Sequence, residues 1–149
     1  MISIQQADFD SAAEYRALRE TGSGTGAIAT FTGLVRDHGD RPDVTGLFLE
    51  HYPGMTEKVI GELIDTARAR WDVRQARIIH RVGTLSLNEQ IVFVGVSSAH
   101  RQDAFAACEY LMDALKTTAP FWKKELTESG EHWVEQKEAD LDRAQGWHD

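Results

Sequence analysis

The sequence is poor in the features that mark secreted, metal-binding and membrane proteins. It has one cysteine among 149 residues, which excludes an internal disulfide and a metal cage built from cysteines. Its longest apolar run, residues 91–96, is far too short to span a bilayer. The N-terminus lacks the basic and apolar regions of a secretory signal. We therefore expect a cytoplasmic protein that inserts in no membrane.

Sequence motifs of several enzyme classes are missing as well. There is no Walker loop, Gly-x-Ser-x-Gly elbow, His-Glu-x-x-His or Cys-x-x-Cys. The six histidines include no i, i+4 pair, so the spacing predicts no metal site, and we expect no bound cofactor. Alternating glycines at 22–26 precede a predicted strand, which favours a linker over a phosphate loop.

Basic residues are in the minority, with 16 Lys and Arg against 24 Asp and Glu and a net charge of -8. This balance argues against nucleic-acid binding. The acidic excess lies in residues 1–20 and 121–149, whereas 21–120 is nearly balanced. Any anion-binding site must therefore be a local cluster, which suits a small anionic ligand better than a polyanion.

Hydrophobic periodicity predicts an α+β fold in a single domain over residues 1–149. Period-two alternation and short apolar runs predict strands at 2–4, 27–36, 46–52, 76–82, 90–97, 121–126 and 133–137, with 90–97 central. The helical period predicts helices at 12–19 after Asp10, at 56–71 with Thr56 as cap, and from 101 until Pro120. We expect a mobile polar loop at 37–43, a turn at 85–89, and a tail at 138–149 that is flexible or docked on a partner.

The third predicted helix carries the only cysteine. Its apolar stripe consists of Ala104, Phe105, Cys108, Leu111, Met112 and Leu115. Free cysteine is among the most buried residue types, and no positive group near Cys108 in sequence favours a thiolate. The pattern predicts a buried small hydrophobe and no nucleophile.

Several cations are candidates for chemistry. His100 and Arg101 stand where a strand meets a helix N-terminus, a position that attracts anions; alternatively, Arg101 pairs with Asp103 or Glu50 on the surface. Arg36 is either part of a site or a solvated strand end.

Lysines gather near the end of the same helix. Lys116 can be a simple partner of the helix dipole. Lys123 and Lys124 follow Phe121 and Trp122 on a strand, where alternation sends the two lysines to opposite faces. A lysine beside aromatic groups and other cations loses proton affinity, which suits acid–base or covalent chemistry.

Five separated segments resemble the large, catalytic subunit family of molybdopterin synthase, the MoaE family. They are TFTGLVR (30–36), LEHYPGM (49–55), IHRVG (79–83), VGVSSAHR (94–101) and LKTTAPFWKKE (115–125). The resemblance covers roughly residues 26–137 in the expected order. Five motifs together are far more specific than any one. The sequence departs from the family pattern at Leu34, where a basic residue is common, and in the loop 37–43.

The resemblance implies an α/β-hammerhead-type α+β fold with a mixed and antiparallel sheet and flanking helices. It implies a homodimer of large subunits, each holding one small ubiquitin-like sulfur carrier, in a heterotetramer. The activity implied is that of a sulfurtransferase of molybdenum cofactor biosynthesis. Two sulfur atoms pass from the carrier's C-terminal Gly-Gly thiocarboxylate to cyclic pyranopterin monophosphate, which forms the dithiolene of molybdopterin.

The same resemblance assigns residues to the site. Those placed against substrate are Arg36, His100, Arg101, Lys116, Lys123, Lys124 and Glu125, and those placed along the channel for the carrier tail are Phe31 and Met112. Substrate and thiocarboxylate are both anionic, so a nest of cations fits the chemistry. We assign Lys116 to acid–base catalysis and Lys123 to holding the thiocarboxylate or substrate.

Two other functions remain open from the sequence. The same basic groove could capture a partner's C-terminal carboxylate without catalysis, or His100 could serve a phosphate-ester hydrolase that needs no partner. The sequence also leaves open whether the site takes residues from both copies of a dimer.

Overall fold

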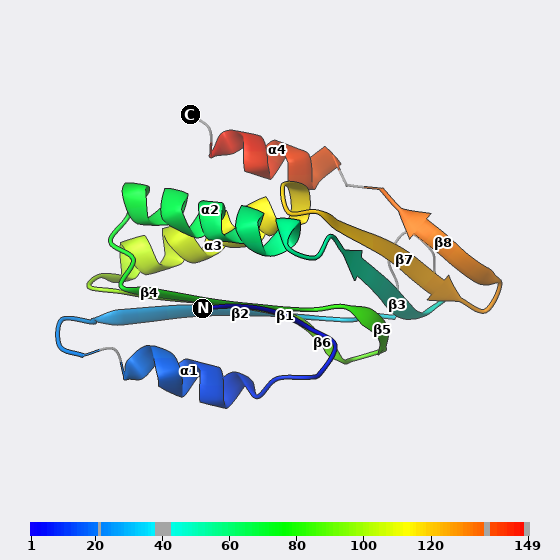
Figure 1. The fold of residues 1–149 in the computed structure, drawn as a ribbon, viewed down its shortest axis with the longest axis horizontal. Helices are drawn as coiled ribbons and strands as arrows, with labels where there is room; N and C mark the ends of the chain where they lie inside the picture. The colour runs from blue at the N-terminus through cyan, green and yellow to red at the C-terminus, as the bar shows by residue number, and fades with distance from the viewer. Residues whose placement is uncertain (21, 38–42, 136–137, 148–149) are drawn as a thin grey trace.

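The computed structural model describes residues 1–20, 22–37, 43–135 and 138–147. Across these residues the chain forms two four-stranded sheets and four helices (Figure 1), which confirms the α+β class. In chain order the elements are β1 (Ile2–Gln5), α1 (Ser11–Arg19), β2 (Ala27–Leu34), β3 (Val44–His51), α2 (Met55–Arg70), β4 (Gln75–Arg81), β5 (Gly83–Ser86), β6 (Gln90–Ser98), α3 (Arg101–Thr117), β7 (Phe121–Thr127), β8 (Gly130–Val134) and α4 (Glu138–Gly146).

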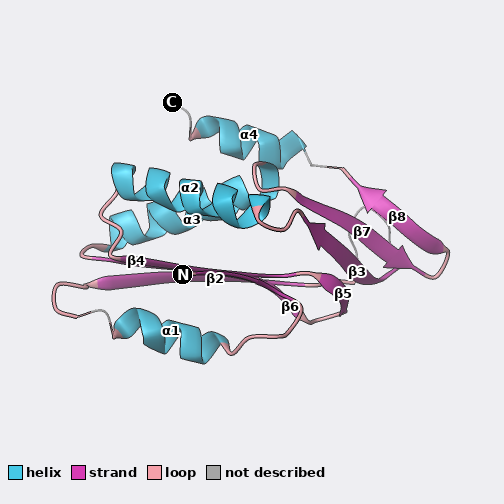
Figure 2. Ribbon diagram, viewed as in Figure 1, coloured by secondary structure: helices cyan, strands magenta, loops and turns pink. Residues whose placement is uncertain are grey.

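The first sheet forms the centre of the core. Its strand order is β1-β4-β6-β2, with β1 parallel to β4 and the other pairs antiparallel. The predicted central strand, β6, is interior and almost entirely buried. Figure 2 shows α2 and α3 on one face of this sheet and α1 on the other. Ile78 and Val94 pack toward the helix pair, whereas Ile79 and Phe93 pack with Leu18 of α1, because alternate strand residues face opposite sides.

The second sheet is antiparallel and has the order β5-β3-β7-β8. The turn predicted at 85–89 is wrong at its start, because Leu85 and Ser86 belong to β5. Leu85 is 1% exposed and packs with Leu47 and Leu49 of β3. The short β4–β5 connection turns at Gly83, whose φ of 89° suits glycine.

The start of α2 differs from the prediction. Gly54 is the N-cap and the helix begins at Met55, so Thr56 is not the cap. The Thr56 hydroxyl is fully buried and lies 3.0 Å from the carbonyl oxygen of Tyr52 and 3.2 Å from that of Pro120. It therefore ties the start of α2 to the segment that enters β7.

The C-terminal segment is helical and docked on its own chain. The sequence predicts a tail that is flexible or bound to a partner, but residues 138–146 form α4, which packs against α3. Trp147 stacks edge-on against Trp71 and Tyr110, and its Nε1 donates to Asp113 at 2.7 Å. Three aromatic rings thus anchor a segment that is polar in sequence.

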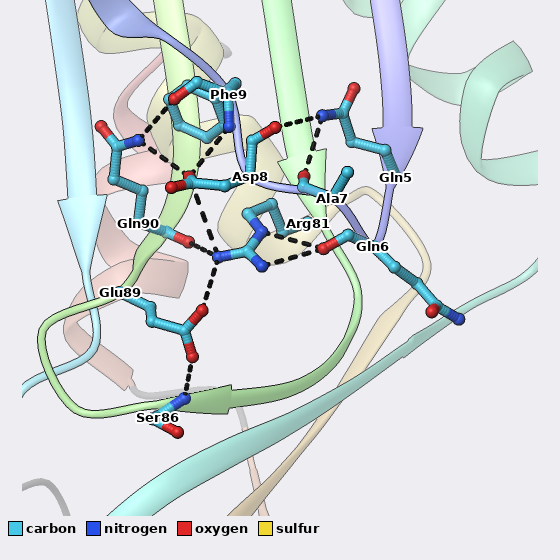
Figure 3. A network of polar contacts seen from close by, with 9 residues as sticks. All are labelled: Gln5, Gln6, Ala7, Asp8, Phe9, Arg81, Ser86, Glu89 and Gln90. Atoms are coloured by element: carbon cyan, nitrogen blue, oxygen red, sulfur yellow. Dashed lines mark hydrogen bonds and ion pairs between the residues drawn. The ribbon is translucent and has the colours of Figure 1, made fainter.

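A buried arginine joins three strands of the first sheet where β1 and β4 end and β6 begins (Figure 3). Arg81 is 6% exposed, and its guanidinium donates to the carbonyl oxygens of Gln6 and Gln90 and to the carboxylate of Glu89. These contacts join the chain after β1 to the turn before β6. Arg81 lies on the opposite sheet face from His80.

The polar loop predicted at 37–43 lies mostly outside the described residues, because 38–42 are not described. Among the helices of the described ranges, none is long and apolar enough to cross a membrane.

Candidate active site

A cavity of about 510 Å³ lies where β2, the C-terminal end of α3 and β7 meet. This volume falls in the range of small-molecule sites. Residues from both sheets and from α3 and α4 line it. They include Phe31, Arg36, Leu47, Leu49, His80, Val92, Met112, Lys116, Phe121, Lys123, Glu125, Glu135 and Asp140.

Three of the predicted cations meet at this cavity. Arg36 follows β2, Lys116 is in the last turn of α3, and Lys123 is on β7. The Lys116 side chain is 50% exposed, so it contacts both the cavity and bulk water. The fold thus gathers charges that are far apart in sequence, as the resemblance implies.

The strand β7 sorts its residues between two faces. Phe121, Lys123 and Glu125 line the cavity, and Glu125 is only 4% exposed. Lys124 is not among the lining residues. Its ammonium lies 4.4 Å from the centre of the Trp133 ring and 3.4 Å from Glu131. The predicted split of the two lysines is confirmed, and Lys124 does not reach the cavity in this structure.

Apolar residues form much of the rest of the wall. Phe31 on β2 and Met112 on α3, both predicted along a channel, line the cavity. Leu47, Leu49 and Val92 are buried beneath it. An extended, uncharged segment of a ligand can pack against this wall.

Acidic groups also line the cavity, of which Glu125 is predicted from the sequence and the other two are not. Glu125, Glu135 and Asp140 stand among the three cations, and Asp140 Oδ2 is 3.9 Å from Lys116 Nζ. The cavity of a single chain therefore combines the predicted cations with an equal number of carboxylates. Asp140 was missed because it belongs to α4, and its helical docking depends on tertiary contacts.

His100 and Arg101 lie at the other end of α3. The helix has 17 residues, so its ends are roughly 24 Å apart. There His100 and Arg101 line a shallow depression with the 66% exposed Phe105, a residue predicted on the buried stripe. Within one chain these cations do not join Lys116 and Lys123.

The surface ion pairs considered for Arg101 do not form in the described part of the chain. No carboxylate there lies within ion-pair distance of Arg101. Asp103 instead accepts a hydrogen bond from the backbone N–H of Asp72 at 2.9 Å. Arg101 and His100 are both exposed, so they can reach a ligand or a second copy of the chain.

His80 was not predicted as a site residue, yet it lines the cavity. It is 8% exposed, its Nδ1 is 2.8 Å from the carbonyl oxygen of Arg81, and its ring stacks on Phe121 with centroids 3.8 Å apart. Burial, with a smaller effect from nearby His51, lowers the pKa of His80 to about 4. The sequence held one indication of this position, because alternation places the polar His80 on the same strand face as the apolar Ile78.

Cys108 is buried, as predicted. Its thiol donates toward the carbonyl oxygen of Val94 at 3.7 Å. Burial raises the pKa of Cys108 to about 11, so the thiolate is scarce at neutral pH. Within the described ranges, no three His, Cys, Asp or Glu residues are grouped so that they could hold a metal ion.

The sequence model of one protein family, described as "MoaE protein", matches residues 4–118. The chain belongs to the MoaE family. A Vibrio cholerae protein named molybdopterin synthase catalytic subunit is 53% identical over 98% of this chain and 97% of its own length. A Pseudomonas aeruginosa protein of the same name is 52% identical with the same coverage.

Solved MoaE structures have the same fold. The molybdopterin biosynthesis MoaE protein from Burkholderia ambifaria superposes with a TM-score of 0.82 at 47% identity, covering 99% of this chain and 97% of that one. Molybdopterin synthase from Staphylococcus aureus gives 0.81 at 32% identity, covering 89% and 96%. The family predicted from five motifs is confirmed over nearly the whole chain.

Proposed function

We propose that this chain is the catalytic subunit of a molybdopterin synthase and acts as a sulfurtransferase. It transfers two sulfur atoms from the C-terminal thiocarboxylate of a small carrier protein to cyclic pyranopterin monophosphate. One observation carries the proposal: a cavity that combines Arg36, Lys116 and Lys123 with an apolar wall, in a chain about half identical to proteins with this name.

The residues that line the cavity suit a thin tail with an anionic end. A Gly-Gly segment has no side chains, so it can pass along Phe31 and Met112 toward the lysines. The thiocarboxylate then ends beside Lys123, where a charge-assisted hydrogen bond is stronger than a neutral one. Ordering the tail costs conformational entropy, so most of the affinity must come from docking of the carrier's globular part elsewhere.

Lys116 is positioned for proton transfer. Replacing a carbon-bound oxygen of the substrate by sulfur requires protons at the departing oxygen, and opening the cyclic phosphate requires them as well. The half-exposed Lys116 can exchange its proton with water between the two transfers. Its ammonium lies 3.9 Å from Asp140 Oδ2.

His100 and Arg101 join the substrate site in this proposal only through a second copy of the chain. One ligand cannot touch both ends of α3, which are roughly 24 Å apart. The three carboxylates that line the cavity also leave it short of positive charge for a substrate with a phosphate. A homodimer that brings one chain's α3 N-terminus to its partner's cavity supplies the missing cations.

The test is reconstitution from purified components. The chain is mixed with thiocarboxylated carrier and cyclic pyranopterin monophosphate, and molybdopterin is measured after oxidation to its fluorescent product. We expect product only when all three are present. Loss of substrate without carrier would instead indicate a hydrolase.

A carrier that lacks its terminal Gly-Gly separates catalysis from capture. We expect it to bind in calorimetry nearly as well as the full carrier but to support no sulfur transfer. Added salt should weaken tail insertion more than apolar docking. A chain that binds full-length carrier and forms no product would be a non-catalytic binding module. If removing Gly-Gly eliminates all association, the groove alone recognises the carrier and the proposed docking surface does not exist.

A further inference from the structure

His80 is a buried polar side chain whose second ring nitrogen has no hydrogen-bond partner among the described residues. Nδ1 lies 2.8 Å from the Arg81 carbonyl oxygen, so this nitrogen carries the proton and donates it. Nε2 makes no hydrogen bond to any residue in the described part of the chain, and it is not one of the fully buried unpaired atoms there, so it stays accessible to solvent. The side chain is more than nine-tenths buried and lines the cavity.

Two contacts hold the ring in place. The Nδ1 hydrogen bond fixes its tautomer, and stacking on Phe121 at an interplanar angle of 17° fixes its plane. Phe121 and Lys123 share one face of β7, so His80 is placed relative to the lysine that holds the anion. The ring is neutral at physiological pH because burial lowers its pKa to about 4, and Nε2 therefore offers a lone pair.

This lone pair differs from the charged groups around the cavity. Lys116, Lys123 and Arg36 only donate, and the three carboxylates accept as charged groups that prefer cationic partners. His80 supplies a neutral acceptor on a wall formed by Phe121 and apolar side chains. Water can satisfy this acceptor in the free protein, but an acceptor left without any donor carries a desolvation cost, so a ligand that excludes the water must supply a donor.

We propose that His80 is a ligand-orienting residue, whose Nε2 accepts a hydrogen bond from an N–H or O–H group of the molecule bound beside Lys123. The inference rests on the proposed function. The donor can come from two sources with the same chemistry, namely a ring N–H or amino group of the pterin, or a backbone N–H of the Gly-Gly tail. In either case His80 discriminates against a ligand that presents an acceptor or an apolar group at this point.

The test compares two variants that both lose the Nδ1 contact. His80→Phe keeps a ring to stack on Phe121 but has no acceptor, whereas His80→Gln places an amide oxygen near the former Nε2. Each protein is titrated with cyclic pyranopterin monophosphate and, separately, with a synthetic peptide that ends in the carrier's Gly-Gly carboxylate.

The variants should separate the acceptor from the packing. We expect His80→Phe to weaken binding of one probe about tenfold and His80→Gln to recover most of that loss. The probe affected identifies the source of the donor. The KM for the molecule that the affected probe represents should rise in His80→Phe, and kcat should change less. Equal losses in both variants, or no loss in either, would overturn the proposal.

A measurement on the unaltered protein covers the case in which a variant does not fold. In ¹⁵N-histidine-labelled protein, the resonance of an unprotonated Nε2 moves when this nitrogen accepts a hydrogen bond. We expect that shift when a saturating probe is added, and its absence with both probes bound would refute the assignment. Product formation by the same wild-type preparation tests the proposed function separately, so the two can fail independently.

Discussion

At the scale of single residues, position relative to the cavity separates groups that look equivalent in the sequence. Lys123 and Lys124 are neighbours in the chain, yet only Lys123 lines the cavity, whereas Lys124 lies over the Trp133 ring. Lys116 differs from both, because its side chain is half exposed beside a carboxylate. These placements lead to different expectations for each lysine.

Lys116→Ala should lose most turnover without unfolding the protein. A positioned acid–base group contributes 10²–10⁴-fold, and an exposed side chain at a helix end adds little to stability. Turnover is measured in the reconstituted assay and carrier binding by calorimetry. Lys58→Ala, on the exposed side of α2, is the matched control.

Lys116→Arg separates charge from proton transfer. Arginine keeps the positive charge but does not give up a proton at neutral pH. Full activity in this variant would show that Lys116 acts by charge alone, and near-normal product formation by Lys116→Ala would remove it from the mechanism.

Lys123→Ala and Lys124→Ala should affect different quantities. The first removes a cation from the cavity and should weaken substrate binding by about 1.5–3 kcal/mol, with little change in stability. The second loses a cation–π contact with Trp133 and should lower the free energy of unfolding by about 0.5–1 kcal/mol. Substrate titration and urea denaturation measure the two effects. An equal loss of substrate affinity in both variants would show that Lys124 contacts substrate in the assembled enzyme, as the family resemblance implies.

At the scale of elements, α3 and the clamp around Arg81 organise the molecule. Helix α3 spans the first sheet and carries Lys116 at one end and Arg101 at the other. Arg81 joins the chain after β1 to the turn before β6 on the face of the sheet away from the cavity. The first element positions chemistry, and the second stabilises the sheet on which the site is built.

Arg81→Met should destabilise the fold without changing kcat. The carbonyl oxygens of Gln6 and Gln90 would lose buried donors, at a cost of about 3 kcal/mol and a fall in Tm of roughly 6–12 °C. Arg74→Met, at an exposed ion pair with Asp72, is the control and should cost at most about 1 kcal/mol. A loss of activity in folded Arg81→Met would mean that the clamp also shapes the site.

The effect of Arg81 on stability should depend on pH. The backbone N–H of Ser86 and the Arg81 guanidinium lower the pKa of Glu89, and the Gln90 amide, the Phe9 N–H and Arg81 lower the pKa of Asp8. A carboxyl whose pKa is lowered by folding stabilises the protein above its unfolded pKa, and the effect is lost as pH falls through the folded pKa. The difference between wild type and Arg81→Met should therefore be largest near neutrality and narrow below about pH 4. Denaturation at several pH values measures it, and a constant difference would contradict this account.

At the scale of the whole molecule, the two ends of α3 present two half-sites. The cavity holds three cations and three carboxylates, and the exposed His100, Arg101 and Phe105 lie at the far end. A two-fold dimer can bring the second set to the cavity of the first, because an isologous interface repeats every contact twice. The proposed substrate site is complete only in that arrangement.

Mixed dimers test this arrangement. Lys116→Ala and Arg101→Ala chains should each be weakly active alone. If each site uses Lys116 of one chain and Arg101 of the other, then one of the two sites in every hybrid dimer is intact. Random mixing should restore about a quarter of wild-type activity. If all site residues come from one chain, hybrids will show no recovery.

The sequence by itself determined the class, the family and most elements. Alternation and helical period depend on local geometry, so they located the central strand at 90–98 and the helix at 101–117 within a residue or two. The five motifs led to Arg36, Lys116, Lys123 and Glu125, which the cavity does bring together. Alternation alone separated Lys123 from Lys124.

Only the tertiary structure decided what depends on contacts between distant segments. Residues Gly83–Ser86 form a strand because they pair with the edge of β3. The polar C-terminal segment forms a docked helix because Trp147 packs against Trp71 and Tyr110. The tertiary structure placed Asp140 beside Lys116 and the neutral His80 in the cavity wall, and it kept His100 away from both lysines. Each of these results depends on burial or on pairing between distant segments. The hydrophobic periodicity of a short stretch of residues determines neither burial nor such pairing.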